Sequence, residues 1–220
     1  MGNPVIVVVG AGAGIGAAVA RRFGQEGYDA ALIARSPGKL QQLGQLLQAE
    51  GITATWAPAD VTDDDAVTAA IERFGQHGGS IRHLHFNPSA FTAKDALELG
   101  VEELLNDVRL GVASLLTAVR AARPFMSAGA RVTSTGGGTA DRPWPQAASL
   151  GVQKAALRNL VMSLDAALAP DDIRAMSLTV AGNIKDGTPF DPTYIADAIY
   201  QASQTDSEFW VNEVRFIGRH

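Results

Sequence analysis

The sequence predicts an α/β fold, a single domain with a doubly wound parallel sheet of about seven strands and helices on both faces. Two observations lead to this prediction. Short apolar segments rich in Val, Ile and Ala alternate along the chain with longer segments of helical periodicity, the pattern of parallel strands joined by crossover helices. The first apolar segment also runs directly into a glycine-rich turn that opens a helix. Residues 1–220 suit one domain, large enough to bury about 70% of the surface of the unfolded chain.

Seven segments have the length and composition of strands. In chain order they are Pro4–Val9, Ala30–Ala34, Thr53–Pro58, His83–Phe86, Ala130–Ser134, Ala175–Val180 and Trp210–Phe216. The first contains a run of β-branched residues, which is typical of a strand buried on both faces of a sheet. The three glycines at 136–138 predict a flexible turn after the fifth strand. The segment Ala181–Pro192 predicts a mobile loop above a ligand.

Helices fill the intervals between these strands. They are predicted for Gly14–Gln25, Pro37–Glu50, a segment beginning near Asp63, Val101–Arg123, Ala147–Ala169 and Thr193–Gln204. Ser36 supplies a cap ahead of Pro37 in the second of these helices, and Asp191 with Pro192 repeats the arrangement before the last. The two longest helices are apolar on more than one side, so we expect them to face the sheet and to offer a surface to another subunit.

Composition and charge exclude several classes of function. The chain carries a net charge of −5 and contains no run of Lys or Arg, which argues against nucleic acid and against an anionic membrane surface as partners. No apolar stretch approaches about 20 residues and no basic, then apolar leader opens the chain, so we expect a soluble protein of the cytoplasm. The absence of cysteine excludes disulfides, thiol nucleophiles and thiolate metal sites.

Two histidines, His83 and His85, alternate on one face of a predicted strand. Such a pair can chelate a metal ion, but no carboxylate and no third histidine lies near it in the sequence. We therefore expect no metal site, and we interpret both residues as histidines of a strand or of the surface whose hydrogen bonds are satisfied.

The glycine-rich turn indicates a site for the pyrophosphate of a dinucleotide. Glycine has no Cβ atom, so the backbone of such a turn can touch the pyrophosphate directly. The following helix then directs its free N–H groups and the positive end of its dipole at the same anion. The strand before the turn and the helix after it supply the context that a glycine motif needs to be informative. The expected contacts are Gly10, Gly12, Gly14, Ile15 and Gly16.

Charged residues after the next two strands bear on the choice of cofactor. About 20 residues past the turn, where an acid would accept a hydrogen bond from the ribose 2′-hydroxyl of NAD, the chain has Arg35 followed by Ser36. The planar guanidinium of an arginine suits the 2′-phosphate of NADP(H). The alternative is an Arg35 that is exposed to solvent and binds nothing. Asp60, beside Val61, is placed to accept a hydrogen bond from the adenine amino group, or it is an ordinary turn residue.

In combination these motifs resemble those of the short-chain dehydrogenase/reductase family along nearly the whole chain. The matching segments are Gly10-x-x-x-Gly14-Ile15-Gly16, Ala34-Arg35-Ser36 of the NADP-preferring type, Asp60-Val61, Asn87 of an Asn-Asn-Ala-Gly motif, and Leu150–Lys154. The resemblance implies a Rossmann fold that binds a nicotinamide dinucleotide and assembles as a homodimer or homotetramer. It also implies cofactor contacts for Asn87, Lys154, Gly182 and Ile184, the last two beside the nicotinamide.

The resemblance does not extend to most of the family's catalytic tetrad. The asparagine, serine, tyrosine and lysine of that tetrad fall on Arg109, Gly137, Leu150 and Lys154, respectively. In the family the tyrosine is the general acid/base, the serine holds the substrate oxygen, and the lysine binds the nicotinamide ribose and lowers the pKa of the tyrosine. Leucine has no proton to donate and glycine has no hydroxyl. Of the four, Lys154 alone is retained, and we expect it to keep its ribose-binding role.

Two functional hypotheses follow, ahead of a purely structural protein that binds no nucleotide. The favoured one is an NADP(H)-binding protein with an eroded oxidoreductase site, weakly active or non-catalytic, that responds to its cofactor. The alternative is an NADPH-dependent carbonyl reductase or alcohol dehydrogenase that uses water or a substitute acid on a small carbonyl or alcohol substrate. Candidates for that acid are Lys154, Ser134, Thr135, Ser149, Tyr194, Lys185 and Asp186. Candidates for the wall of a substrate pocket are Phe91, Trp144 and Phe190.

Overall fold

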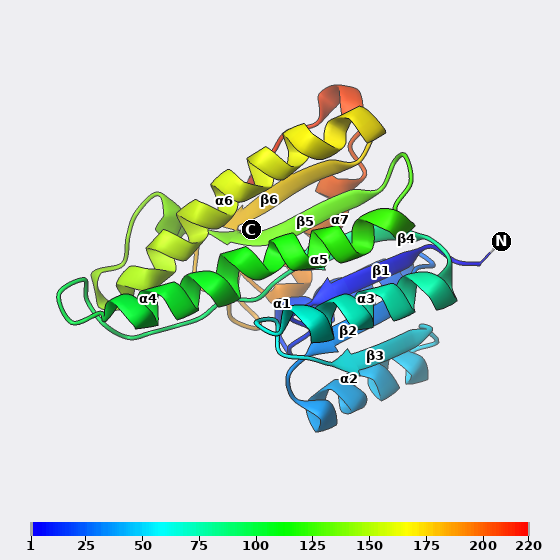
Figure 1. The fold of residues 1–220 in the computed structure, drawn as a ribbon, viewed down its shortest axis with the longest axis horizontal. Coiled ribbons are helices and arrows are strands. Elements are labelled where there is room, and N and C mark those ends of the chain that lie inside the picture. The colour runs from blue at the N-terminus through cyan, green and yellow to red at the C-terminus, as the bar shows by residue number, and fades with distance from the viewer. Residues whose placement is uncertain (1, 220) are drawn as a thin grey trace.

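The computed structural model describes residues 2–219, and these contain one seven-stranded sheet. Its strands are β1 (Val5–Val9), β2 (Asp29–Ala34), β3 (Ala54–Pro58), β4 (Ile81–Phe86), β5 (Arg131–Gly137), β6 (Arg174–Val180) and β7 (Glu213–Phe216). The spatial order is β3-β2-β1-β4-β5-β6-β7, and all neighbouring strands are parallel. The predicted fold class is confirmed (Figure 1). The order reverses between β1 and β4, the switch point at which a doubly wound sheet forms its ligand crevice.

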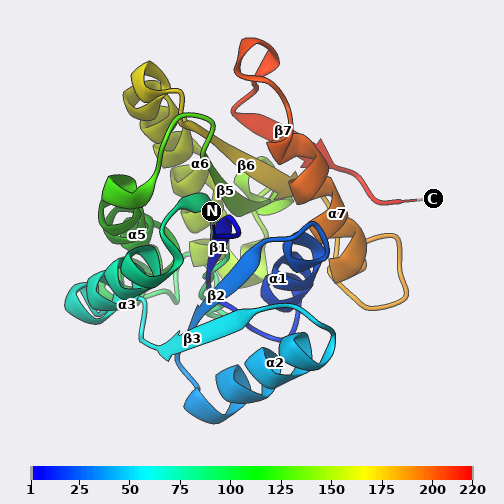
Figure 2. The same ribbon diagram turned by 90° about the vertical axis from the view of Figure 1, so that its right-hand side faces the viewer.

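Helices cover both faces of the sheet. They are α1 (Ile15–Gln25), α2 (Pro37–Ala49), α3 (Asp64–Gly78), α4 (Val101–Val108), α5 (Ser114–Ala122), α6 (Ala148–Leu168) and α7 (Pro192–Ser203). Helices α1, α2 and α7 lie on one side, and α3, α5 and α6 lie on the other (Figure 2). Because all strands are parallel, their carboxyl ends meet at one edge, where the loops can build a site. Within residues 2–219, none of the helices has the length and apolar character needed to cross a membrane.

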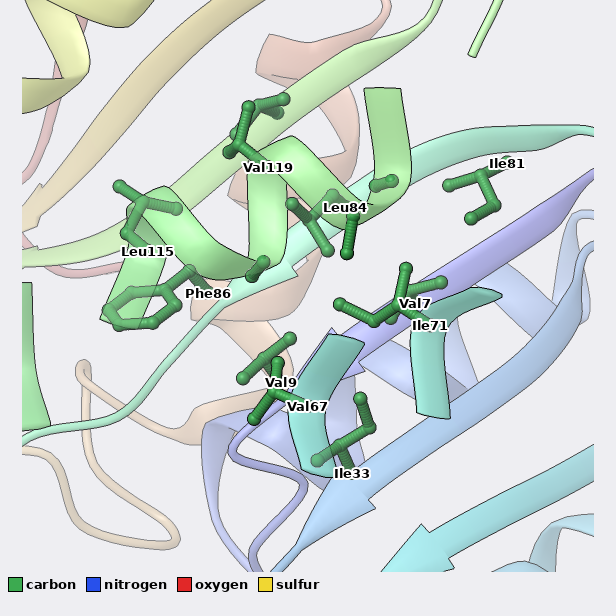
Figure 3. Close-up of a cluster of buried hydrophobic side chains, with 14 of the residues drawn as sticks. Val7, Val9, Ile33, Val67, Ile71, Ile81, Leu84, Phe86, Leu115 and Val119 are labelled. Carbon is green, nitrogen blue, oxygen red and sulfur yellow. The ribbon is translucent and has the colours of Figure 1, made fainter. Parts of the chain in front are cut away.

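The first strand explains why the core has two apolar layers. All five residues of β1 are buried, and their side chains alternate between the two faces. Val7 and Val9 belong to the layer under α3 and α5, whereas Ile6 and Val8 belong to the layer under α1 and α7. Figure 3 shows the first of these layers, in which helical side chains such as Leu115 face the strands. A continuous run of β-branched residues is therefore needed in β1, since both of its faces are covered.

One of the predicted helices is interrupted. A single helix is predicted for Val101–Arg123, whereas the structure contains α4, a π-helical turn at Arg109–Ala113, and α5. The turn occurs where the chain approaches α6, since a Cβ atom on Gly111 would lie 2.3 Å from Oε1 of Gln153. Such turns are frequent at functional sites. The hydrophobic periodicity of the segment does not reveal the extra residue.

Strand β5 continues three residues past its predicted end. Gly136 and Gly137 pair with Thr179 and Val180 of β6, so the prediction of a flexible turn is wrong for these two glycines. A Cβ atom on Gly136 would lie 2.6 Å from Oγ of Ser177. Close packing within the sheet, and not a turn, is therefore the reason for glycine at position 136.

A largely buried ion pair joins α6 to the start of β6. The carboxylate of Asp165 accepts hydrogen bonds from Nε and Nη2 of Arg174, at 2.9 and 2.7 Å, and from the backbone N–H of Ala175 at 2.7 Å. Burial opposes ionisation of this carboxyl, but the hydrogen bonds outweigh burial and lower the pKa of Asp165. We expect Asp165→Ala to reduce the free energy of unfolding by about 3 kcal/mol in urea denaturation at neutral pH, because Arg174 would lose its partner.

The matched control for this prediction is Asp171→Ala, which removes an exposed ion pair with Arg123 near the end of α6. Its expected cost is below about 1 kcal/mol, because exposed pairs contribute little. The contribution of Asp165 should be present above the pKa of an unfolded aspartate, about 4, and should be lost as the pH falls through the lower folded value. Equal losses for the two variants would contradict the assignment.

Candidate functional site

The glycine turn joins β1 to α1 at the carboxyl edge of the sheet. Gly10 has a φ of +84°, and a Cβ atom there would lie 3.0 Å from the backbone nitrogen of Pro88. A Cβ atom on Gly16 would lie 2.5 Å from the carbonyl oxygen of Gly10. By contrast, the Cβ positions of Gly12 and Gly14 have no protein atom within 4 Å. Gly10 and Gly16 therefore allow the turn to form, whereas Gly12 and Gly14 leave open space beside it.

This division of roles predicts different effects for two substitutions. Gly12→Val places a branched side chain in the open space and is expected to weaken nucleotide binding by about tenfold or more with little change in Tm. Gly16→Ala drives a methyl group into the backbone of the turn and is expected to lower Tm by several degrees. Calorimetry and a fluorescence titration with NADPH check both outcomes. Wild-type affinity in the Gly12→Val protein would contradict a ligand at this turn.

A cavity of about 740 Å³ lies between the glycine turn and α2, and we call it the first cavity. Arg35, Ser36 and Lys39 line it, and within residues 2–219 neither Arg35 nor Lys39 makes an ion pair. Arg21 lines it too, but its guanidinium is held by Glu50 at 2.6 and 2.8 Å. Lys39 was not identified from the sequence, because a single lysine in the first turn of a predicted helix gives no sign of its place beside Arg35. The first cavity thus presents two cations without anionic partners.

Asp60 follows β3 and forms a turn. Its Oδ1 accepts hydrogen bonds from the backbone N–H and the hydroxyl of Thr62, at 2.9 and 2.7 Å. These two bonds, with a smaller contribution from Arg35, lower the pKa of Asp60. The structure therefore contains the turn that was the alternative interpretation of Asp60, and contact of this carboxylate with adenine stays a prediction. Val61, the next residue, is buried and lines the first cavity.

A second cavity, of about 1,020 Å³, adjoins the first. Asn87 and Ser89 line both cavities and mark the boundary between them. The second cavity brings together residues that are far apart in the sequence, because the carboxyl ends of β4, β5 and β6 meet at one edge of the sheet. The predicted cofactor contacts and tetrad positions that line it are Gly14, Ile15, Asn87, Gly137, Leu150, Lys154, Gly182 and Ile184.

Lys154 lies on α6, one helical turn after Leu150, and is buried. Its Nζ donates a hydrogen bond to the backbone oxygen of Thr135 at 2.9 Å, and no carboxylate of residues 2–219 pairs with it. Burial lowers the pKa of Lys154 to about 8. A Cβ atom on Gly137 would lie 3.3 to 3.6 Å from carbons of the lysine side chain. The amine therefore stands in the cavity wall with glycine and leucine as its neighbours.

The lowered pKa makes Lys154 a source of instability. The folded-state pKa of about 8 lies below the ordinary value of 10.5, so the unfolded chain binds the proton more tightly and stability rises with pH between these two values. We expect Lys154→Met to raise the free energy of unfolding by about 1–3 kcal/mol at neutral pH, and the gain to vanish at strongly alkaline pH. Urea denaturation at several pH values checks this. A gain that does not change with pH would show that the charge is not the cause.

Arg109 does not join this site. Its Nη2 donates to the backbone oxygen of Thr62 at 2.8 Å and to Asp64 at 3.1 Å, so the side chain reaches toward α3. The residues of this helix that meet α6 are Asp107, which accepts a hydrogen bond from Ser149, and Gly111. Arg109 therefore stands at a tetrad position in the sequence, but it is not part of the wall of the second cavity, and its guanidinium is held at the acidic start of α3.

Two of the candidate substitute acids line the second cavity, Lys154 and Thr135. Ser134 lies between Thr133 and Thr135 on the strand, so its side chain points to the opposite face of β5. The hydroxyl of Ser149 is directed away from the cavity and donates to Asp107 at 2.6 Å. The remaining candidates are not part of the cavity wall and are Tyr194, Lys185 and Asp186.

Aromatic side chains form one side of the second cavity. Phe91 and Trp144 line it, and both rings are exposed, with centroids 5.7 Å apart. The third candidate, Phe190, does not line the second cavity. Its ring packs against Phe216 with centroids 5.8 Å apart, and a Cβ atom on Gly182 would lie 2.3 Å from it, so Phe190 supports the loop from behind.

Comparison with known proteins identifies the family. The sequence profile of the family described as short chain dehydrogenase matches residues 4–190. The chain belongs to this family. Short-chain dehydrogenases are oxidoreductases that use a nicotinamide cofactor, which agrees with the glycine turn and the two adjoining cavities.

This short-chain dehydrogenase is similar in sequence to an uncharacterized oxidoreductase of Staphylococcus aureus, with 26% identity over 226 residues that cover 96% of each chain. It is 33% identical over 122 residues to a 3-dehydrosphinganine reductase of Arabidopsis thaliana, and the match covers 55% of this chain and 36% of that reductase. Thus about a third of the length of the plant reductase is matched.

Solved structures show the same fold. A short chain dehydrogenase from Mycobacterium smegmatis has a TM-score of 0.90 at 20% identity, with 100% of this chain and 93% of the other covered. A short chain dehydrogenase from Burkholderia cenocepacia, solved in complex with NADP, has a TM-score of 0.88 at 24% identity, with 98% and 96% covered. The Rossmann fold of the family therefore extends over the whole chain.

Proposed function

We propose that this short-chain dehydrogenase binds NADP(H) but has an eroded oxidoreductase site, so that it is weakly active or non-catalytic and responds to its cofactor. The observation that carries the proposal is Leu150, which lines the second cavity one helical turn before the buried Lys154. An apolar side chain at this place neither donates nor accepts a proton. The site thus combines a retained nucleotide turn and lysine with the loss of the family's general acid.

The described residues fit a phosphorylated dinucleotide. Arg35 and Lys39 are two exposed cations without anionic partners, and with Ser36 they would hold the 2′-phosphate in the first cavity. The pyrophosphate would cross the open space at Gly12 and Gly14. There α1 begins without a side-chain cap, so its first N–H groups are free to donate to an anion.

The nicotinamide half would enter the second cavity, where it would supply hydride chemistry. Lys154 would bind its ribose, and Gly182 and Ile184 would lie beside the nicotinamide ring. The loss of a general acid reduces the rate of a proton-coupled step by about 10²–10⁴. Once the acid is lost, the replacement of the family serine by Gly137 reduces the rate little further, because the effects of residues that act together on the rate are not additive.

One observation favours a second candidate function, an NADPH-dependent carbonyl reductase that uses Lys154 as its acid. An ammonium with a pKa of about 8 is close to the pH at which a general acid works best, and Lys154 lines the cavity. In this reaction a hydride would add to the carbonyl carbon, and Lys154 Nζ would give a proton to the carbonyl oxygen. The rate would fall as the pH rises through about 8, because the ammonium form is lost.

A direct test comprises two measurements on the purified protein. Fluorescence titration with NADPH and with NADH tests the cofactor assignment, and comparable weak affinity for both would overturn it. NADPH consumption with a panel of aldehydes and ketones, and NADP reduction with alcohols, separates the two functions. Turnover at ordinary enzyme rates, about 1–10³ per second, would refute the eroded site and favour the reductase.

Association of copies of this chain is part of the proposal. Exposed apolar side chains stand on α4 at Val101 and Leu105, and on α6 at Val152 and Met162. We propose that these two helices carry the interface of a homodimer or homotetramer in the cytoplasm, without nucleic acid or membrane as a partner. Light scattering on the eluate of a sizing column tests this, and a monomer at micromolar concentration would overturn it.

A further inference from the structure

A chain of buried hydrogen bonds runs between β4 and β5 toward the boundary of the two cavities. His83 Nε2 lies 2.8 Å from Thr133 Oγ1, which lies 2.9 Å from His85 Nδ1. His85 Nε2 lies 3.3 Å from Thr135 Oγ1, and that hydroxyl lies 2.8 Å from Asn87 Oδ1. Both histidines and both threonines are buried. These contacts make one continuous row of polar groups on a single face of the sheet.

The hydrogen bond at the glycine-turn end of the row determines which group donates at each of the other contacts. The carbonyl oxygen of Gly10 can only accept, so the group of Asn87 that lies 3.1 Å from it is the amide NH₂. The amide oxygen of Asn87 therefore faces Thr135, and the single hydroxyl proton of Thr135 is donated to it. Since that proton is used, Thr135 Oγ1 must accept from His85, which places a proton on Nε2 of His85.

The same reasoning settles the rest of the row. Burial holds the pKa of His85 at about 3 and that of His83 well below its ordinary value, so each ring carries one proton. With the proton of His85 on Nε2, its Nδ1 must accept from the hydroxyl of Thr133. Thr133 in turn accepts from Nε2 of His83. All donors therefore point from His83 toward the glycine turn.

The row reaches the site through Thr135 and Asn87. Asn87 lines both cavities and holds the carbonyl of Gly10, the first residue of the turn. Thr135 lines the second cavity, and its backbone oxygen accepts the hydrogen bond from Lys154. One residue thus connects the buried row with the retained lysine. The contact with His85 occupies the side of the Thr135 oxygen that its bond to Asn87 leaves free.

We infer that His85 is a positioning residue for the pyrophosphate and nicotinamide part of the cofactor site, acting through Thr135 and Asn87. The inference rests on the proposed binding of NADP(H). It gives a reason for two polar rings in a buried strand. Within residues 2–219 no group of three or more His, Cys, Asp or Glu side chains is placed to hold a metal ion. It also assigns the two histidines a role that requires neutral rings of a defined tautomer. The sequence alone suggested only that their hydrogen bonds are satisfied.

The first test needs no cofactor. NMR measurement of the ring ¹⁵N shifts in the free protein is expected to show that both His83 and His85 are neutral and protonated on Nε2 at pH 6. A cationic ring, or a proton on Nδ1 of His85, would overturn the derived direction of the row and with it the inference.

The second test compares two ligands. We expect His85→Leu to weaken NADPH binding about tenfold while the affinity for adenosine 2′-monophosphate changes less than about twofold, because the latter contacts the Arg35 side and lacks both the pyrophosphate and the nicotinamide half. His85→Gln, which restores a donor, should recover part of the loss. The matched control is Ser134→Ala, a buried hydroxyl on the opposite face of β5, for which both affinities should stay at wild type.

The outcomes separate the two proposals. Equal weakening of both ligands in His85→Leu, or none, overturns the positioning role and leaves NADP(H) binding intact. A wild-type protein that binds neither ligand overturns the proposed function together with this inference. If His85→Leu does not fold, Thr135→Val provides the same comparison, because it removes the hydroxyl between His85 and Asn87 and keeps the backbone oxygen that Lys154 contacts.

Discussion

The double variant Gly137→Ser, Leu150→Tyr is expected to reduce aldehydes with NADPH about 10²–10⁴ times faster than the wild-type protein. The tyrosine would restore a general acid one helical turn before Lys154, in the wall of the second cavity. The buried ammonium would lower the pKa of that phenol, as an adjacent positive charge does. The measurement is the decrease in NADPH absorbance with a panel of aldehydes and ketones.

The structure has room for both side chains. Leu150 lines a cavity of about 1,020 Å³, so a phenol at this position has open space to enter. Position 137 is extended backbone, and a Cβ atom there would lie 3.3 to 3.6 Å from Lys154, a contact that a small shift of the lysine relieves. Overpacking is therefore not expected to unfold the variant.

Single variants sharpen this prediction. Leu150→Tyr alone should give most of the gain and Gly137→Ser alone should give almost none, because the residues of one catalytic group are not additive. Leu150→Phe is the control, since it supplies the ring without the hydroxyl and should leave the rate at the wild-type level. If the double variant binds NADPH but stays inactive on every substrate, the missing acid is not the reason for the low reductase activity of this protein.

The second large effect concerns the choice of cofactor. The double variant Arg35→Ala, Lys39→Ala is expected to bind NADPH about 10²- to 10⁴-fold more weakly, whereas its affinity for NADH should change less than about twofold. Each lost charge-assisted hydrogen bond costs about 1.5–3 kcal/mol of binding free energy. NADH has no 2′-phosphate, so the double variant removes no such bond from its complex. Titration at fixed ionic strength is required, because salt screens exposed charges.

Arg21→Ala is the matched control for this experiment. Arg21 lines the same cavity, but its guanidinium is bound to Glu50, so its removal should change the affinity for NADPH less than about twofold. A loss for Arg21→Ala as large as that for the double variant would mean that the positive potential of the whole cavity, and not the pair at positions 35 and 39, selects the phosphate.

The glycine turn and the end of β2 beside it could be predicted from the sequence because their signals are local. Gly10 and Gly16 follow a buried strand within a few residues. The close approach at Gly16 involves only the adjacent turn of backbone, whereas Gly10 also meets Pro88. Arg35 stands at the end of β2, and parallel strands bring such ends to one edge. Lys39 belongs to the same group, but without its helix in view a surface lysine is not informative.

The features that the sequence did not predict depended on contacts between distant segments. Arg109 bonds to residues at the start of α3, and a π-helical turn sets its direction. Phe190 packs against Phe216 and not toward the ligand cavity. Gly136 pairs with Thr179 of the neighbouring strand, and Ser177 of that strand leaves no space there for a side chain. Periodicity and motif spacing contain no information on any of these contacts.

The sequence by itself determined the α/β class, the nucleotide turn, and the presence of lysine and leucine where a family tetrad has lysine and tyrosine. These follow from residue type and spacing along one strand or one helix turn. The tertiary structure alone decided that Lys154 is desolvated and that His85, Thr135 and Asn87 form one directed row. Burial and hydrogen-bond partners depend on which strands become neighbours, and that depends on the packing of the whole chain.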